Sequence, residues 1–271
     1  MPEMQNKLGA HSGSYQPYRL EDALHGIASA GFRYVELSSI RGVVEHVPLD
    51  GGDGELSGVR KNLEFTGLTP VSLSGHSDLT AESGIRDASL ALHLCNQLGI
   101  PILNTAVGGA FNEQEDEGAF LSNMEGLAAE AEKMGVVIAI EIHGTLTATG
   151  AKTRRLVDKV GHPSVRINYD TANCEYFAGV GAEQDLPDAF PLVAHCHLKD
   201  HIGGQREWNF PAIGKGTINF ARLLGLFREA GYAGPFTVEL EFQGEPWPAL
   251  DAVTNAMVES CRHLRSLGLG C

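Results

Sequence analysis

Short apolar runs alternate with longer stretches of helical periodicity along the whole chain. The runs that predict buried strands are 7–10, 34–37, 70–73, 102–105, 136–142, 165–169, 193–198 and 236–240. Helical stretches lie between them, for example 20–30, 82–98, 115–134, 219–230 and 249–266. Ile85, Ala88, Leu92 and Cys95 recur at spacings of three and four, which would place them on one helical face. This alternation predicts an α/β protein, a single (β/α)8 barrel domain over residues 1–271.

Glycine marks the ends of the expected helices. The glycines that stand just before an expected strand are Gly31, Gly67, Gly99, Gly135, Gly161 and Gly231. Because glycine adopts the left-handed conformation at little cost, these positions predict helix stops. The interval 45–66 begins with several glycines and predicts a long loop followed by a short helix.

Composition narrows the class of protein. The 271 residues carry a formal net charge of −14, which disfavours a nucleic-acid binder because such a protein needs a basic surface. Five cysteines without a CxxC pair are typical of a reducing compartment. The first ten residues, MPEMQNKLGA, lack the apolar core of a signal peptide, and no run of about 18 apolar residues suggests a membrane span. We therefore expect a cytoplasmic protein that binds neither nucleic acid nor membrane. It is possible by sequence that the chain forms a homo-oligomer.

Four acidic or imidazole side chains lie where consecutive apolar runs end: Glu141, Asp170, His197 and Glu239. They are spaced about one strand–helix unit apart. Side chains alternate between the two faces of a strand, so Glu239 faces the opposite way from its apolar neighbour Val238. The chemistry of a (β/α)8 barrel lies at the carboxyl ends of its strands. We therefore expect these four groups to point inward and to converge at one mouth of the barrel.

This set of groups suits a divalent metal ion. Buried carboxylates and imidazoles are costly unless they are paired or bind a metal. Three carboxylates and one imidazole form an oxygen-rich set that fits Mn²⁺ best, with Mg²⁺ and Co²⁺ as alternatives. Zn²⁺ is less favoured because thiolates and further histidines are missing from the set. The sequence thus predicts one divalent ion at this site.

Five motifs in this order resemble the xylose isomerase-like superfamily of sugar isomerases and epimerases. The motifs are EIHG (141–144), YDTAN (169–173), HCHLKD (195–200), FPAIGKGTINF (210–220) and FTVELE (236–241). The resemblance runs from Gly9 to about Cys261 and implies a metal held by the same four residues. It departs at Lys215, since the family often has an acidic residue between these glycines. Lysine there suits either a phosphate-bearing substrate or an exposed surface. Glu241 faces the same way as Glu239, but the motif favours Glu239 as the ligand.

The resemblance implies an isomerase or epimerase that acts on a keto-sugar, keto-inositol or related polyol. A metal ion that chelates the substrate's carbonyl oxygen and a neighbouring hydroxyl oxygen acidifies the C–H bond and stabilises the enediolate. Glu141 and Glu239 are then the expected acid/base pair as well as ligands, while Asp170 and His197 are chiefly ligands. Return of the proton from the opposite face epimerises the carbon, and return to the adjacent carbon interconverts aldose and ketose.

Further candidates for contact with the substrate are His143, Asn173, Lys199, His76, Glu36, Arg206 and Trp208. His143 shares the inward face with Glu141 and could donate to a hydroxyl group. Asn173 follows the aspartate by three residues, where the resemblance implies a substrate contact. Lys199 could balance the charge of the enediolate, and His76 follows the third expected strand. For each of them a structural hydrogen bond or ion pair is the alternative.

Other positions carry more open interpretations. Arg206 could bind a carboxylate or phosphate, and Trp208 could stack on a sugar or anchor its loop. Glu36 could contact the substrate or pair with a cation inside the barrel. His195 is deeper than His197, which favours a histidine hydrogen-bonded in the core. Asp200 is expected to face outward or to cap the loop that follows it.

Three other functions compete with the isomerase. A dehydratase of an inosose or of a 3-dehydroshikimate-like substrate would use the same metal-stabilised enolate to expel a hydroxyl group, so its product would lack one water. A nuclease of the AP endonuclease type would need more histidines and a basic groove. A non-catalytic sugar or metal binder would leave every substrate unchanged.

Overall fold

Eight parallel strands close on themselves in the computed structural model, which describes residues 4–109, 115–243 and 246–270. The strands are β1 (Leu8–His11), β2 (Tyr34–Ile40), β4 (Thr69–Ser74), β5 (Ile102–Thr105), β6 (Val137–Glu141), β7 (Val165–Asp170), β8 (Val193–Leu198) and β9 (Phe236–Val238). They pair in the order β1-β9-β8-β7-β6-β5-β4-β2, and β1 pairs with β2 to complete the ring. The predicted single (β/α)8 barrel is confirmed.

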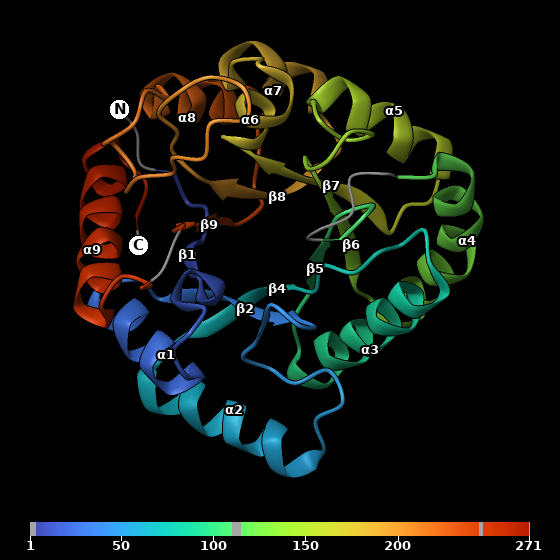
Figure 1. The fold of residues 1–271 in the computed structure, drawn as a ribbon, viewed down its shortest axis with the longest axis horizontal. Helices are drawn as coiled ribbons and strands as arrows, with labels where there is room; N and C mark the ends of the chain where they lie inside the picture. The colour runs from blue at the N-terminus through green and yellow to red at the C-terminus, as the bar shows by residue number, and fades with distance from the viewer. Residues whose placement is uncertain (1–3, 110–114, 244–245, 271) are drawn as a thin grey trace.

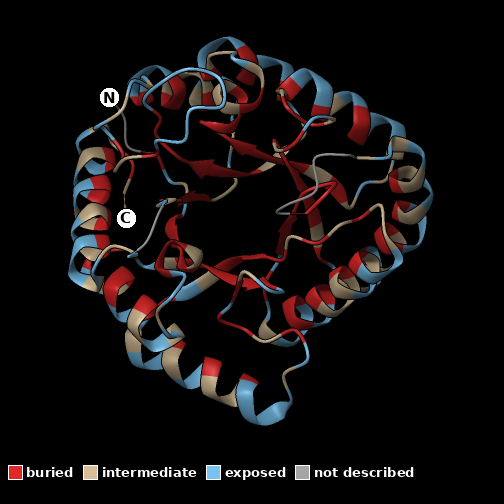
Figure 2. Ribbon diagram, viewed as in Figure 1, coloured by how far each residue is buried: buried red, intermediate tan, exposed pale blue. Residues whose placement is uncertain are grey.

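Helices surround this ring on all sides (Figure 1). They are α1 (Leu20–Ser29), α2 (Asp53–Thr66), α3 (Glu82–Leu98), α4 (Glu117–Met134), α5 (Gly150–Val160), α6 (Asn173–Ala178), α7 (Ala182–Ala189), α8 (Phe220–Glu229) and α9 (Leu250–Ser266). A short 3-10 helix, η1 (Ser12–Tyr15), follows β1. Figure 2 shows buried residues on the inward sides of the helices and exposed residues on their outward sides. Among the described residues, no helix has the length and apolar character needed to cross a membrane.

The glycine stops are confirmed by the backbone. Gly67, Gly99, Gly135 and Gly161 cap their helices in the left-handed conformation, with φ between 63° and 69°. Since a side chain is strained in this conformation and glycine is not, the chain turns at these points into the next strand.

The interval 45–66 differs from the expectation of a short helix. Its helix α2 has 14 residues and contains Gly54 and Gly58. Leu56, Val59 and Leu63 are buried at helical spacing, so packing outweighs a cost of about 1 kcal/mol for each interior glycine. A two-residue strand, β3 (Val44–Glu45), was also not expected; it pairs antiparallel with the end of β2.

Apolar and polar side chains lie on opposite faces of the strands, as the alternation predicted. On β9, Phe236 and Val238 pack in the apolar layer, while the Thr237 hydroxyl between them donates to Glu36 Oε2 at 2.6 Å. On β8, His195 and His197 are fully buried on the inner face. The centre of the barrel is therefore polar and its outer layer apolar, so inward groups must find partners within the ring.

Two glycines should respond oppositely to replacement by alanine. Gly84 is buried in α3, and a Cβ there would overlap the backbone carbonyl of Asp78. Gly126 is exposed in the middle of α4 with open space around its Cβ position. Chemical denaturation should show Gly84→Ala destabilised by about 2 kcal/mol or more. Gly126→Ala should be stabilised by about 0.5–1 kcal/mol. Equal effects of the two substitutions would contradict this packing.

Candidate metal centre and active site

Four side chains from four strand ends meet at the mouth of the barrel. Glu141 ends β6, Asp170 ends β7, His197 lies near the end of β8, and Glu239 directly follows β9. Each offers a ligand atom, and these atoms all lie within 4.8 Å of one another. The convergence expected from the sequence is thus present, because neighbouring parallel strands end at the same rim.

The imidazole of His197 faces the three carboxylates with one ring nitrogen. Nδ1 lies 3.4 Å from Glu141 Oε1, 3.5 Å from Glu239 Oε2 and 3.9 Å from Asp170 Oδ2. One nitrogen and three carboxylate oxygens therefore surround a common point. This donor set is the oxygen-rich kind that suits a hard divalent cation.

The state of Asp170 supports the fit of this set to a metal. Its Oδ2 is buried and has no hydrogen-bond partner among the described residues, although the Lys199 ammonium lies 3.1 Å away. Burial raises the pKa of Asp170 to about 7 despite that ammonium, and Glu141 and Glu239 add to the rise. A buried oxygen without a hydrogen bond, among like charges, is where a cation would be most stabilising.

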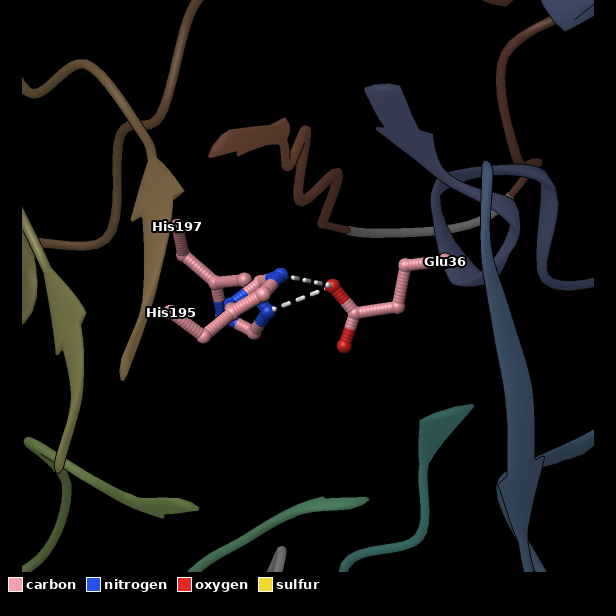
Figure 3. A group of neighbouring side chains, drawn as sticks. All are labelled: Glu36, His195 and His197. Carbon is pink, nitrogen blue, oxygen red and sulfur yellow. Dashed lines mark hydrogen bonds and ion pairs between the residues drawn. The ribbon is translucent and has the colours of Figure 1, made fainter. Parts of the chain in front are cut away.

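Glu36 holds the other nitrogen of the same imidazole. His197 Nε2 lies 3.0 Å from Glu36 Oε2 (Figure 3). Asn104 Nδ2 donates to Glu36 Oε1 at 2.7 Å. Burial pushes the pKa of Glu36 upward, but His197 and His195 outweigh it and hold the pKa well below its usual range. A carboxylate behind a histidine fixes the ring and leaves Nδ1 free to bind a metal. Glu36 is fully buried and absent from the cavity wall, which favours the alternative that it pairs with a cation inside the barrel.

His195 lies deeper in the barrel and is surrounded by hydrogen-bonding groups. Its Nε2 is 3.0 Å from Ser72 Oγ, and its Nδ1 donates to Asn168 Oδ1 at 2.9 Å. Burial lowers the pKa of His195 to about 3, so the ring is neutral. The expected core histidine is confirmed. Together with Glu36 it forms a supporting layer under the four-residue cluster.

Each of the two glutamates has a histidine behind it. His76 Nε2 lies 2.6 Å from Glu141 Oε2, and His11 Nδ1 lies 3.0 Å from Glu239 Oε1. Burial pushes the pKa of Glu141 upward, but His197 and His76 outweigh it and keep the pKa well below the usual range. For Glu239, Lys199 and His197 outweigh burial in the same way. Both glutamates are therefore ionised and held in place.

His11 is the residue that sequence reasoning missed. It ends β1, directly after the expected strand 7–10, and its ring stacks on that of His197 with centroids 5.7 Å apart. The rule that selected the other strand ends would have found it had the strand been extended by one residue. In the sequence, a single histidine after a short apolar run carries little signal.

Lys199 is the cation nearest to the cluster. Its Nζ lies 3.1 Å from Asp170 Oδ2, 3.2 Å from Glu239 Oε2 and 3.1 Å from Glu241 Oε2. Burial alone would lower the pKa of Lys199, but Asp170, Glu241 and Glu239 outweigh it and raise the pKa well above its usual range. Lys199 thus carries a permanent positive charge beside the carboxylates, and Glu241 contacts this charge rather than the four-residue cluster.

A cavity of about 340 Å³ opens above these groups. Of the expected substrate contacts, the residues on its wall are His76, His143, Asn173, Lys199 and Trp208. Asn173 also donates to Glu141 Oε1 at 3.1 Å. Arg206 is exposed and absent from this wall, and its guanidinium lies over the rings of Phe177 and Tyr176. This position favours the alternative of a solvated arginine, and a contact between Arg206 and the substrate stays a prediction.

Known proteins share this architecture. A probable L-ribulose-5-phosphate 3-epimerase of Mycoplasma pneumoniae is 24% identical over 231 residues, which cover 80% of this chain and 75% of that protein. The structure of D-allulose 3-epimerase from Methylomonas sp. matches with a TM-score of 0.77 and 19% identity, covering 98% of this chain and 100% of that one. A xylose isomerase-like TIM barrel protein from Mycobacterium smegmatis, solved in complex with magnesium, matches with a TM-score of 0.77 and 16% identity, covering 97% and 98%.

The two structural matches fall below 25% identity and therefore show a shared fold. The family match extends over most of the sequence: the family described as "Xylose isomerase-like TIM barrel" matches residues 24–267. This span includes all four residues of the cluster and the strands that carry them. The chain belongs to the xylose isomerase-like TIM barrel family.

Proposed function

We propose that the protein is a divalent-metal-dependent sugar epimerase that inverts a carbon beside the carbonyl group of a keto-sugar. The observation that carries the proposal is the pair of ionised, histidine-backed glutamates on either side of the cluster. Glu141 and Glu239 come from β6 and β9, which two further strands separate in the ring. Two bases that approach one carbon from different sides are what an epimerisation needs.

The residues that would hold the metal are Glu141, Asp170, His197 through Nδ1, and Glu239. A bound divalent ion would polarise the substrate's carbonyl oxygen and lower the cost of the negative charge that forms on removal of the C–H proton. The magnesium named for the Mycobacterium smegmatis structure supports a hard divalent ion. Mn²⁺ remains our proposal for this chain, with Mg²⁺ and Co²⁺ as alternatives.

The protein's own groups would move the proton. One glutamate removes the proton from the carbon with the carboxylate oxygen that faces the cluster, while its histidine partner holds the other oxygen in place. For the proton balance to close, the second glutamate has to carry a proton when the substrate is bound; it gives this proton to the carbon from the opposite face, and exchange with solvent then resets both groups. Lys199 would offset the negative charge that develops on the substrate oxygens. The relatives named as 3-epimerases support return to the same carbon rather than to its neighbour.

Removal of either acid/base group should abolish proton transfer. Glu141→Gln and Glu239→Gln should each lower the rate of solvent-deuterium exchange into the substrate by roughly 10²–10⁴-fold, measured by NMR with metal present. Glu125→Gln, on the exposed face of α4, is the matched control and should exchange at the wild-type rate. Wild-type exchange by both site variants would exclude the assignment. Loss of water from the product would identify a dehydratase instead.

Metal binding should depend on the imidazole at the centre of the cluster. Addition of Mn²⁺ to the metal-free protein should raise its Tm, because a ligand that binds only the folded state stabilises it. His197→Ala should lose most of this rise and should retain less metal after dialysis. His93→Ala, an exposed position on α3, should behave as wild type. Unaltered metal content in His197→Ala would count against the ligand set.

Glu36 should affect the metal without touching it. Glu36→Gln removes the charge behind His197 Nε2 and should weaken Mn²⁺ affinity by roughly 10- to 100-fold in a calorimetric titration. The exposed Glu45→Gln serves as control. The Tm of the metal-free variants should be measured alongside to separate affinity from folding. Wild-type affinity in a folded Glu36→Gln protein would rule out this supporting role.

A further inference from the structure

The wall of the cavity carries little positive charge. Among the described residues that line it, Lys199 is the single Lys or Arg, and three carboxylates already surround its ammonium group. The three carboxylates of the proposed ligand set exceed the charge of a divalent ion by one, and Glu241 offsets Lys199. The cations that a phosphate dianion would meet here, Lys199 and His76, already pair with carboxylates, and a further buried charge without its own partner is costly.

The loop after β8 is where barrels of this type often bind phosphate with backbone amides. Here the carboxylate of Asp200 takes the place that a phosphate would occupy. The amides of Gly214 and Gly216 both donate to Asp200 Oδ2 at 2.8 Å, and the amide of Ile218 donates to Oδ1 at 3.2 Å. The expectation that Asp200 caps this loop is confirmed. The backbone amides that a phosphate would need are thus already hydrogen-bonded to an internal carboxylate.

Two other basic side chains near this mouth pair with carboxylates, and the exposed Arg206 lies over the rings of Tyr176 and Phe177. Lys215 is largely exposed and pairs with Glu259 at 3.6 Å, so it is the surface lysine of the two alternatives. Arg41 precedes the cavity residue Gly42, but its guanidinium contacts Asp50 at 2.9 Å and Asp87 at 3.0 Å. The internal spans that the structure does not describe read AFNEQ (110–114) and GE (244–245) and contain neither Lys nor Arg.

The outer part of the wall is aromatic and offers neutral hydrogen-bonding groups. Its rings are Tyr176, Phe177, Trp208, Phe210, Phe242 and Trp247. Trp247 Nε1 and His143 Nδ1 are buried and have no hydrogen-bond partner among the described residues. Aromatic faces pack against the C–H groups of a sugar, and unpaired ring nitrogens can bond to its hydroxyl groups. Such a wall matches a neutral polyol.

We propose that the substrate is an uncharged keto-sugar without a phosphate group, bound with its distal end against this aromatic wall. This inference rests on the proposed function and names its substrate class. It departs from the phosphate ester in the name of the Mycoplasma pneumoniae relative. The reason is local: the cavity wall supplies rings and neutral nitrogens where a phosphate would need cations or open amides.

The test compares matched sugars with and without a terminal phosphate. Solvent-deuterium exchange is measured with the Mn²⁺-loaded protein on L-ribulose against L-ribulose 5-phosphate, and on D-fructose against D-fructose 6-phosphate. We expect kcat/KM for the free ketose of at least one pair to exceed that for its ester by roughly 100-fold or more, the scale set by an unpaired buried charge. Faster exchange with the esters would overturn the inference and leave the proposed function intact.

Absence of exchange with every sugar would instead defeat the proposed function. In that case the inference is tested by calorimetry, which compares the binding of each free ketose with that of its ester. Tighter binding of the free ketose supports it. Tighter binding of the ester, or binding of neither sugar, overturns it.

A substitution at the cavity wall tests the electrostatic reason. Gln16 lines the cavity and is exposed, so arginine should fit there without disturbing the fold. Gln16→Arg should raise the ester-to-ketose ratio of kcat/KM by roughly tenfold, as one new charge-assisted contact would. Gln16→Met, with no added charge, should leave this ratio unchanged. If the ratio stays constant in Gln16→Arg, a missing cation is not what excludes the ester, and the inference falls.

Discussion

Buried negative charge is the constraint on which the rest of this structure depends. Glu141, Asp170 and Glu239 are buried at the mouth of the barrel, and their ligand atoms lie within 4.8 Å of one another. Carboxylates in such surroundings stay ionised only where positive charge compensates for the lost water. Lys199 and, while protonated, His197 supply that charge; a divalent ion bound at the neutral Nδ1 of His197 would take the place of the imidazolium charge. The apolar layer between strands and helices supplies the stability that holds this unfavourable group together.

Support for the site comes from across the barrel rather than from neighbouring residues in the chain. Glu36 on β2 holds His197 on β8, and His11 on β1 holds Glu239 after β9. Each contact removes a degree of freedom from a side chain that would otherwise rotate. Acid/base chemistry needs its groups placed to within fractions of an ångström, and a closed ring of strands provides that rigidity. Glu36 is therefore part of the proposed catalytic arrangement although it does not line the cavity, whereas His11 lines it.

The site has two levels with different physical character. Its floor, formed by the four-residue cluster and Lys199, is charged and hydrogen-bonded, and proton transfer would take place there. Its wall is aromatic, and Asp200 already fills the loop amides that could bind an anion. Chemistry would depend on the floor and choice of substrate on the wall, which is how one barrel architecture can serve different sugars.

The sequence by itself determined the barrel, the helix stops and the four residues of the cluster. These follow from local rules: alternation along a strand, glycine at helix ends, and strand ends that share one rim. Only the tertiary structure decided that Nδ1 of His197 faces the cluster, that His11 and Glu36 support it, and that Arg206 lies off the cavity wall. His11 and Glu239 are 228 positions apart in the chain, and their contact exists only because β1 closes the ring against β9. Periodicity reports which face a side chain occupies, whereas partners across a closed barrel are set by the folded geometry of all its strands.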